Sequence, residues 1–142
     1  MEIGEQVLNS PEPRTPEDEE IMRQHTLLGA RMLEELDAYR DEDFVRVAYQ
    51  ICRWHHERYD GSGYPDQLVG EQIPIAAQVV GLADAYETLT TGSGSQPPVP
   101  CAAAVQMLCT GEAGAFNPVL LDCLREIENE IDDAMRRRPE TL

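Results

Sequence analysis

His-His-Glu-Arg-Tyr-Asp-Gly-Ser-Gly-Tyr-Pro, residues 55–65, stands near the middle of this chain. Two adjacent histidines come first, and two glycines and a proline follow within ten residues. Glycine and proline interrupt helices, so the segment predicts the end of a helix followed by a shaped loop. Gly-Ser-Gly-Tyr-Pro alone is a common kind of turn. The adjacent histidines make this turn a candidate site for chemistry.

Upstream of this segment, apolar residues recur at the three-to-four spacing of amphipathic helices. Thr15 and Pro16 form a helix start, and His25 lies in the apolar stripe that follows, so it should face inward. A second helix is expected after Asp41, with His55 and His56 near its C-terminal end. The expected buried faces comprise Ile21, Met22, Leu28, Met32, Leu33 and Leu36, then Phe44, Val45, Ala48, Ile51 and Cys52.

Downstream, Pro74 opens a third helix that runs from Ile75 to about Thr90. Its broad apolar face also includes Asp84, a carboxylate that would need a partner there. That face comprises Ile75, Val79, Val80, Leu82, Ala83, Tyr86 and Leu89.

The rest of the chain predicts one loop and two further helices. Residues 92–99 are rich in Gly, Ser and Pro and predict a flexible loop. A short helix from Pro100 to Thr110 follows, and Asn117 caps a last helix whose apolar stripe extends to Met135. No repeat and no alternating strand pattern is found. The sequence therefore predicts an all-α fold, a single helical-bundle domain of about five helices over residues 1–142.

Composition narrows the class of protein. The chain has 142 residues, 42% hydrophobic, and a formal net charge of −16. Such a charge repels nucleic-acid phosphates and anionic lipids, so neither DNA nor a membrane is expected as a partner. The sequence contains no long apolar run and its first residues do not resemble a signal peptide, so a cytoplasmic location is expected. The four cysteines form no Cys-x-x-Cys pair and are expected to be buried free thiols.

The three histidines are the strongest chemical signal in the sequence. Neutral imidazoles of His25, His55 and His56, with the Asp84 carboxylate from a neighbouring helix, form a donor set for zinc, iron, manganese or nickel. The alternative is that the histidines are hydrogen-bonded core residues. Adjacent residues also point about 100° apart on a regular helix, so spacing alone leaves both interpretations open.

Residues 55–65 resemble the signature segment of the HD-GYP family of metal-dependent phosphohydrolases. The resemblance covers roughly residues 3–127 and includes residues 22–29, 70–74, 83–90 and 116–118. It implies a helical bundle around two or three iron or manganese ions and a cytoplasmic bacterial enzyme that hydrolyses cyclic di-GMP. It also implies that His25, His55 and His56 bind one metal and that Asp84 binds its neighbour. In the same way, it makes Asp60, Gly61, Gly63, Tyr64 and Pro65 the loop motif and a candidate partner contact.

The chain departs from the family pattern at two places. The family's His-Asp pair, followed by Ile-Gly-Lys, aligns with residues 1–5, so Met1 and Glu2 replace the pair and Glu5 replaces the lysine. Residues 1–14 are therefore interpreted as an irregular remnant of that motif, with Glu2 as the candidate remnant of the aspartate. The family's Arg-Pro-Tyr segment, which contacts substrate, is replaced by residues 91–96, Thr-Gly-Ser-Gly-Ser-Gln.

These departures favour a degenerate or N-terminally truncated HD-GYP-like domain. We expect it to be weakly active or inactive, with at most one transition-metal ion, iron, manganese, zinc or nickel. It would act as a regulatory or protein-interaction module in cyclic di-GMP signalling, with a cyclic dinucleotide as candidate ligand. The alternative is a metal-dependent phosphodiesterase that hydrolyses cyclic di-GMP. Incompletely covered apolar surface at Ile21, Leu28, Met32 and Val79 predicts a homodimer or a signalling protein partner, with Tyr64 as a further contact.

Overall fold

The computed structural model describes residues 15–39, 41–92 and 96–137. Within these ranges the chain forms six α-helices, two 3₁₀ helices and no β-strand, which confirms the predicted all-α class. The α-helices are α2 (Pro16–Glu34), α3 (Asp43–Trp54), α4 (Ile75–Thr91), α5 (Cys101–Thr110), α6 (Pro118–Glu126) and α7 (Glu128–Arg136). The 3₁₀ helices are η1 (Asp37–Tyr39) and η2 (Gly70–Gln72). None of these helices has the length and apolar character needed to cross a membrane.

Local side-chain chemistry fixes where two of the helices begin. The Thr15 hydroxyl accepts a hydrogen bond from the Asp18 N–H at 3.2 Å, and the Asp18 carboxylate accepts one from the Thr15 N–H at 2.9 Å. This reciprocal pair satisfies N–H groups that a helix end would otherwise leave unpaired. Asn117 caps α6, and its side chain accepts from the Val119 N–H at 3.0 Å. Both predicted helix starts are confirmed.

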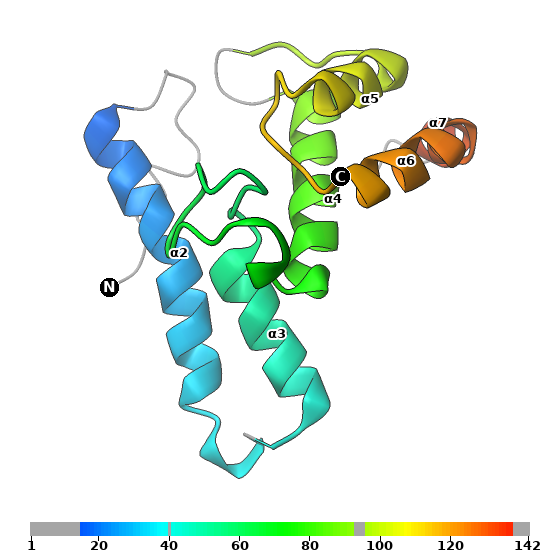
Figure 1. Cartoon of the computed structure of the whole chain (residues 1–142). Coiled ribbons are helices and arrows are strands. Elements are labelled where there is room, and N and C mark those ends of the chain that lie inside the picture. Colours follow the sequence, from blue (N-terminus) through cyan, green and yellow to red (C-terminus); the bar gives the residue numbers. More distant parts are fainter. Residues whose placement is uncertain (1–14, 40, 93–95, 138–142) are drawn as a thin grey trace.

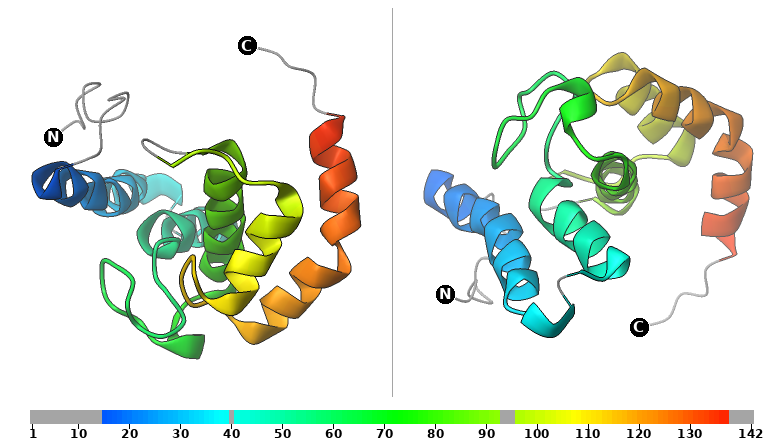
Figure 2. Two further views of the ribbon diagram at one scale, coloured as in Figure 1. Left: turned by 90° about the horizontal axis from the view of Figure 1, so that it is seen from above. Right: turned by 60° about the horizontal axis from the view of Figure 1, so that its bottom comes forward.

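α4 is the central element of the bundle. Figure 1 shows α2 and α3 side by side on one flank of α4, with α5, α6 and α7 on the other. The right panel of Figure 2 looks nearly along α4 and shows the two groups on opposite sides of it. Contacts link α3 to α4 and α4 to α5, so α4 joins the two groups.

The main apolar core lies between α4, α5 and α6. Its buried members are Leu82, Ala85, Tyr86, Ala104, Val105, Leu108 and Leu124. A buried polar pair lies beside this core: Asn117 Nδ2 donates to Gln78 Oε1 at 2.9 Å, and Gln78 Nε2 donates to the Ile73 carbonyl at 2.7 Å. Because Asn117 bonds directly to the buried Gln78 side chain of α4, the contact fixes the start of α6 against α4.

Several apolar side chains that were predicted to be buried lie at the surface. Phe44 is 82% exposed and Met32 is 70% exposed. The others are Leu36, Ile75, Val79, Ala83 and, in the apolar stripe predicted after Asn117, Ile127. A periodic pattern identifies an apolar stripe on a helix but does not show how far along it a neighbouring helix reaches. The four cysteines are free, as predicted, but Cys123 is exposed and the other three are only half-buried.

The prediction of a single helix after Asn117 is wrong, because the structure has two helices there, α6 and α7. The chain bends at Ile127, whose φ of −99° and ψ of 7° depart from helical values. α7 then contacts α5, and Ile131 packs against the main core. Packing against the core therefore overrides the continuous periodic pattern.

Two predicted segments lie wholly or partly outside the described residues. These are residues 1–14, which include Glu2, and residues 93–95 of the loop predicted over 92–99. At the two described ends of that loop, Gly92 terminates α4 with φ of 78°, and the Val99 N–H donates to the Leu89 carbonyl at 2.9 Å. The loop thus leaves α4 and returns to it.

Candidate metal centre

Three imidazoles converge where α2 passes the end of α3. His25 lies on α2, His55 is the residue that ends α3, and His56 follows it. One nitrogen of each ring can be chosen so that all three atoms lie within 4.8 Å of one another. His25 Nε2 and His55 Nε2 are 3.3 Å apart. This spacing suits three nitrogen ligands around a single ion.

Two backbone hydrogen bonds orient these rings. His25 Nδ1 donates to the Met22 carbonyl, and His55 Nδ1 donates to the Ile51 carbonyl at 2.8 Å. A carbonyl oxygen can only accept, so each Nδ1 carries a proton and each Nε2 has a lone pair in the neutral ring. The two lone pairs face each other, an arrangement that a metal ion or a shared proton stabilises.

His56 is held in its neutral form. Burial of the ring, together with the neighbouring His55 and His25, lowers the pKa of His56 from 6.5 to about 3. Burial penalises a charged imidazolium, and nearby imidazoles oppose a further positive charge. The neutral ring is the form that binds metal ions, so His56 can act as a ligand at neutral and mildly acidic pH.

Asp84 lies beside the histidines on α4. Its Oδ2 is 4.0 Å from His56 Nδ1, and its side chain is 45% exposed. Asp84 does not belong to the group of three side chains whose ligand atoms lie within 4.8 Å of one another. It is therefore next to the histidine cluster and not within it. Its assignment as the ligand of a neighbouring ion stays a prediction.

α4 can approach the histidines because Gly81 has no side chain. Gly81 is buried, and a Cβ atom there would lie closer than 3.0 Å to the His55 carbonyl oxygen. Asp84 follows three residues later and so lies on a neighbouring part of the same helix face. Gly81 thus sets the distance between Asp84 and the end of α3. A single glycine inside a helical pattern is the sequence signal that could have pointed to it.

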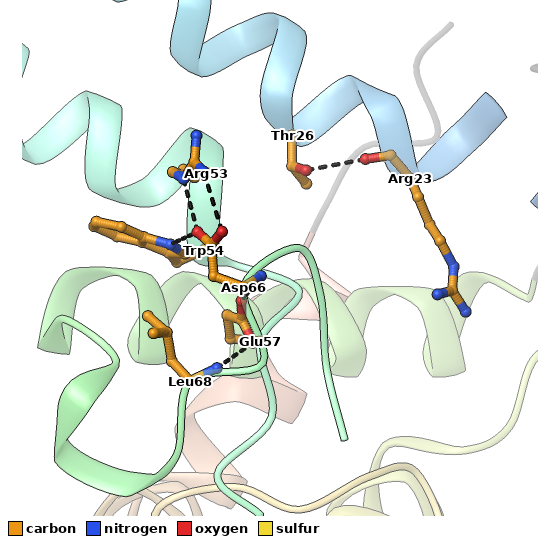
Figure 3. Close-up of polar contacts among 7 residues, drawn as sticks. All are labelled: Arg23, Thr26, Arg53, Trp54, Glu57, Asp66 and Leu68. Carbon is orange, nitrogen blue, oxygen red and sulfur yellow. Dashed lines mark hydrogen bonds and ion pairs between the residues drawn. The ribbon is translucent and has the colours of Figure 1, made fainter. Parts of the chain in front are cut away.

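Glu57 anchors the loop that follows the histidines. Its side chain is only 5% exposed, and its carboxylate accepts from the backbone N–H groups of Asp66 at 2.7 Å and Leu68 at 3.0 Å. Figure 3 shows Glu57 beneath Asp66, with its bond to Leu68. A buried carboxylate is stable only with such donors. The two bonds therefore hold residues 66–68 against the residue next to His56.

Asp66 attaches the same loop to the end of α3. Its carboxylate accepts from Arg53 Nε at 2.7 Å, Arg53 Nη2 at 3.1 Å and Trp54 Nε1 at 2.7 Å (Figure 3). The hydrogen bond from Arg53, with that from Trp54, lowers the pKa of Asp66 below its usual value of 3.8. A paired, two-point contact of this kind has a fixed geometry. The loop is thus attached to α3 through side chains as well as through the chain itself.

Backbone geometry explains the glycines of the predicted loop motif. The Asp60 carboxylate accepts from the Ser62 hydroxyl at 2.6 Å and from the Ser62 N–H at 3.0 Å, and Gly61 has φ of 82°. Gly63 packs against the backbone of residues 56–58 so closely that no Cβ atom would fit. The turn therefore folds back onto the histidine pair.

Tyr64 belongs to the histidine site through direct ring contact. Its ring stacks on His56, with centroids 4.9 Å apart and planes 26° apart. The peptide bond between Tyr64 and Pro65 is cis. The guanidinium carbon of Arg23, from α2, lies 5.1 Å from the centroid of the Tyr64 ring. Half-buried Tyr64 thus connects the histidine cluster to a cation at the surface.

The structure brings together three of the predicted site residues and places a fourth beside them. His25, His55 and His56 form the cluster, Asp84 is adjacent, and Glu2 lies outside the described residues. The sequence interpretation missed the anchoring, spacing and cationic residues around the cluster, which are Glu57, Asp66, Gly81 and Arg23. Their roles depend on contacts between segments, and only the helical glycine has a pattern that could have indicated it.

The chain belongs to the HD domain family, because the family model matches residues 1–119. A cyclic di-GMP phosphodiesterase of Thermotoga maritima is 32% identical over 135 residues, which are 95% of this chain and 36% of that protein. A probable cyclic di-GMP phosphodiesterase of Vibrio cholerae is 34% identical and covers 94% of this chain. These similarities confirm the resemblance to HD-GYP domains. The family is metal-dependent, and the histidine cluster agrees with that property.

Other relatives act on a related nucleotide. A 3'3'-cGAMP-specific phosphodiesterase of Vibrio cholerae is 28% identical over 124 residues, 87% of this chain and 23% of that protein. The chain spans about a third of the length of the first two relatives, 36% and 31%. The names of these relatives thus give different cyclic dinucleotides as their substrates.

Proposed function

We propose that this chain is a degenerate HD-GYP-like domain that binds one transition-metal ion and acts as a regulatory or protein-interaction module in cyclic di-GMP signalling. His25, His55 and His56 would hold the ion. The supporting observation is the pair of Nε2 atoms of His25 and His55, 3.3 Å apart, with both Nδ1 atoms bonded to backbone carbonyls. Iron, manganese, zinc and nickel all accept such nitrogen ligands.

The residues around the ion orient it and its ligands. A bound ion would polarise a phosphoryl oxygen or lower the pKa of a bound water molecule. Glu57 holds the loop that carries Tyr64, and the Met22 and Ile51 carbonyls keep two imidazoles turned toward the centre. Such outer contacts tune ligand affinity strongly.

Weak or absent hydrolysis is the second part of the proposal. The net charge of −16 repels a phosphodiester dianion, and the sequence has no Lys or Arg between Arg58 and Arg125. The segment that would supply the family's substrate-binding arginine therefore offers no cation. Charge stabilisation is usually the largest contribution to phosphoryl-transfer rates, so its loss lowers turnover greatly.

One observation favours the alternative, a metal-dependent phosphodiesterase that hydrolyses cyclic di-GMP. Asp84 Oδ2 lies 4.0 Å from His56 Nδ1, and its half-exposed carboxylate is available to a second ion. Two adjacent ions can stabilise both the attacking and the leaving oxygen of a phosphodiester.

Metal analysis paired with a turnover assay separates these functions. Protein purified without added ions should contain at most one transition-metal ion per chain, and His55→Ala should lower that content sharply. Asp122→Ala, on the exposed face of α6, is the control and should retain the ion. Two well-occupied ions would contradict the one-ion site. Metal-dependent cyclic di-GMP turnover that His56→Ala and Asp84→Ala abolish would establish the phosphodiesterase instead.

The proposal also includes a second copy of the chain as partner. Met32 is 70% exposed and Val79 is 48% exposed, whereas Ile21 and Leu28 are half-buried. Val79 borders an apolar groove of about 490 Å³ between α4, α6 and α7. Contiguous exposed apolar surface is uncommon on monomers. Light scattering at micromolar concentration should show a dimer, and Val79→Glu should reduce it more than Val47→Glu on α3. A strictly monomeric wild type would contradict this part.

A further inference from the structure

Arg23 lies at the outer end of a stack that leads to the histidine cluster. Steps of 4.9 Å and 5.1 Å connect the His56 ring to the Tyr64 ring and the Tyr64 ring to the Arg23 guanidinium. Figure 3 shows the Arg23 side chain extending away from α2, while its backbone carbonyl accepts from the Thr26 hydroxyl at 2.9 Å. The cation–π contact restrains an otherwise flexible side chain.

Arg23 has no acidic partner among the residues that the structure describes, and its side chain is exposed. Among the described residues, the two arginines at the end of α3 and just after it are engaged. Arg53 binds Asp66, and Arg58 packs over Phe116 and donates to the Glu57 carbonyl at 3.1 Å. The guanidinium donors of Arg23 are therefore available to a ligand. In a chain with no lysine and a net charge of −16, such a cation beside a candidate metal centre is unusual.

We propose that Arg23 is a phosphate-binding residue that selects ligands with two phosphodiesters. A cyclic dinucleotide has two phosphodiester groups on one ring, so one can lie at the ion while the other reaches Arg23. Guanidinium groups bind phosphate oxygens through paired hydrogen bonds. This inference rests on the proposed function, because it requires the metal centre and a cyclic dinucleotide ligand. Tyr64 acts as a positioning residue that holds the guanidinium on the side of His56.

The test compares charge-matched variants of α2 in the full chain loaded with Mn²⁺. Calorimetry measures cyclic di-GMP binding by the wild type, Arg23→Gln, Arg23→Lys and Arg31→Gln. Arg31 is also exposed on α2, two helical turns further along, so its variant removes the same charge away from Tyr64. We expect Arg23→Gln to weaken binding roughly tenfold, Arg23→Lys to weaken it less, and Arg31→Gln to leave it unchanged.

A second ligand separates phosphate recognition from a structural effect. Cyclic GMP has one phosphodiester, so its affinity should be the same for the wild type and Arg23→Gln, and both proteins should hold the same amount of Mn²⁺. If Arg23→Gln binds cyclic di-GMP as tightly as the wild type, the inference is wrong and the metal centre is unaffected. An equal loss for both nucleotides also overturns it. If the wild type holds Mn²⁺ but binds no cyclic di-GMP, the ligand assignment and this inference both fail. If it holds neither Mn²⁺ nor iron, zinc or nickel, the proposed metal site fails first.

Discussion

Gly81→Ala is the substitution that best tests how the candidate metal centre is built. The new Cβ atom would lie closer than 3.0 Å to the His55 carbonyl oxygen. A flexible side chain could move aside, but this neighbour is a peptide group at the end of α3. α4 and the end of α3 would therefore have to separate, and both Asp84 and the histidine pair would move with them.

Two opposing effects determine the magnitude. Alanine is more favourable than glycine inside a helix by about 0.5–1 kcal/mol. Forcing an extra methyl group into a close-packed contact typically costs about 1–3 kcal/mol. Because the obstacle is backbone, the cost should lie toward the upper end and exceed the gain. We expect Gly81→Ala to lower the free energy of unfolding by about 2 kcal/mol.

Gly29 supplies a matched control in another helix. A Cβ atom at Gly29 would lie 3.4 Å from Cys52 Cβ, which is an ordinary van der Waals contact. Only the helix-propensity gain remains there, so Gly29→Ala should be neutral or stabilising by about 0.5 kcal/mol. Urea unfolding at pH 7 measures both variants, and metal analysis should show a loss only in Gly81→Ala. A Gly81→Ala protein as stable and as metal-rich as Gly29→Ala would refute the close-approach argument.

Three further predictions concern anchoring, protonation and capping. Glu57→Gln replaces one of the two buried acceptor oxygens of Glu57 with an NH2 donor that faces a backbone N–H. Urea unfolding should show a loss of about 2 kcal/mol in the free energy of unfolding, against less than about 0.5 kcal/mol for the exposed Glu126→Gln. In metal-free protein, His56 has a pKa of about 3 in the folded chain and 6.5 in the unfolded chain, so as the pH falls the unfolded chain binds a proton at His56 before the folded chain does. Stability should therefore fall as pH drops from 6.5 toward 3, by at most about 1.4 kcal/mol per unit, and His56→Gln should flatten the slope between pH 6.5 and 4.5. Asn117→Ala removes both the α6 cap and the partner of Gln78, and thermal unfolding should show a loss of about 2 kcal/mol.

The helices themselves could be predicted because their signals are local. The reciprocal bonds of Thr15 and Asp18, and the cap at Asn117, lie within a few residues of the helix ends that they determine. The bend at Ile127 has no such signal, since neither glycine nor proline is nearby in the sequence. It exists because Ile131 packs against the main core. Exposure of Phe44 likewise depends on how far neighbouring helices extend, which periodicity does not contain.

The same distinction applies to the candidate metal centre: the orientation of its rings is local, whereas its surroundings depend on tertiary contacts. His25 bonds to the carbonyl three residues before it, and His55 to the carbonyl four residues before it, so the helix that carries each ring also turns it. That part of the site follows from helical periodicity, which is why an inward His25 and a histidine at a helix end could be foreseen. The surroundings of the rings have another origin: Gly81 lets α4 lie close to the end of α3, and the buried carboxylate of Glu57 holds the following loop beside His56. Substitution of one histidine should remove one ligand, whereas substitution of Gly81 or Glu57 should displace several ligands together.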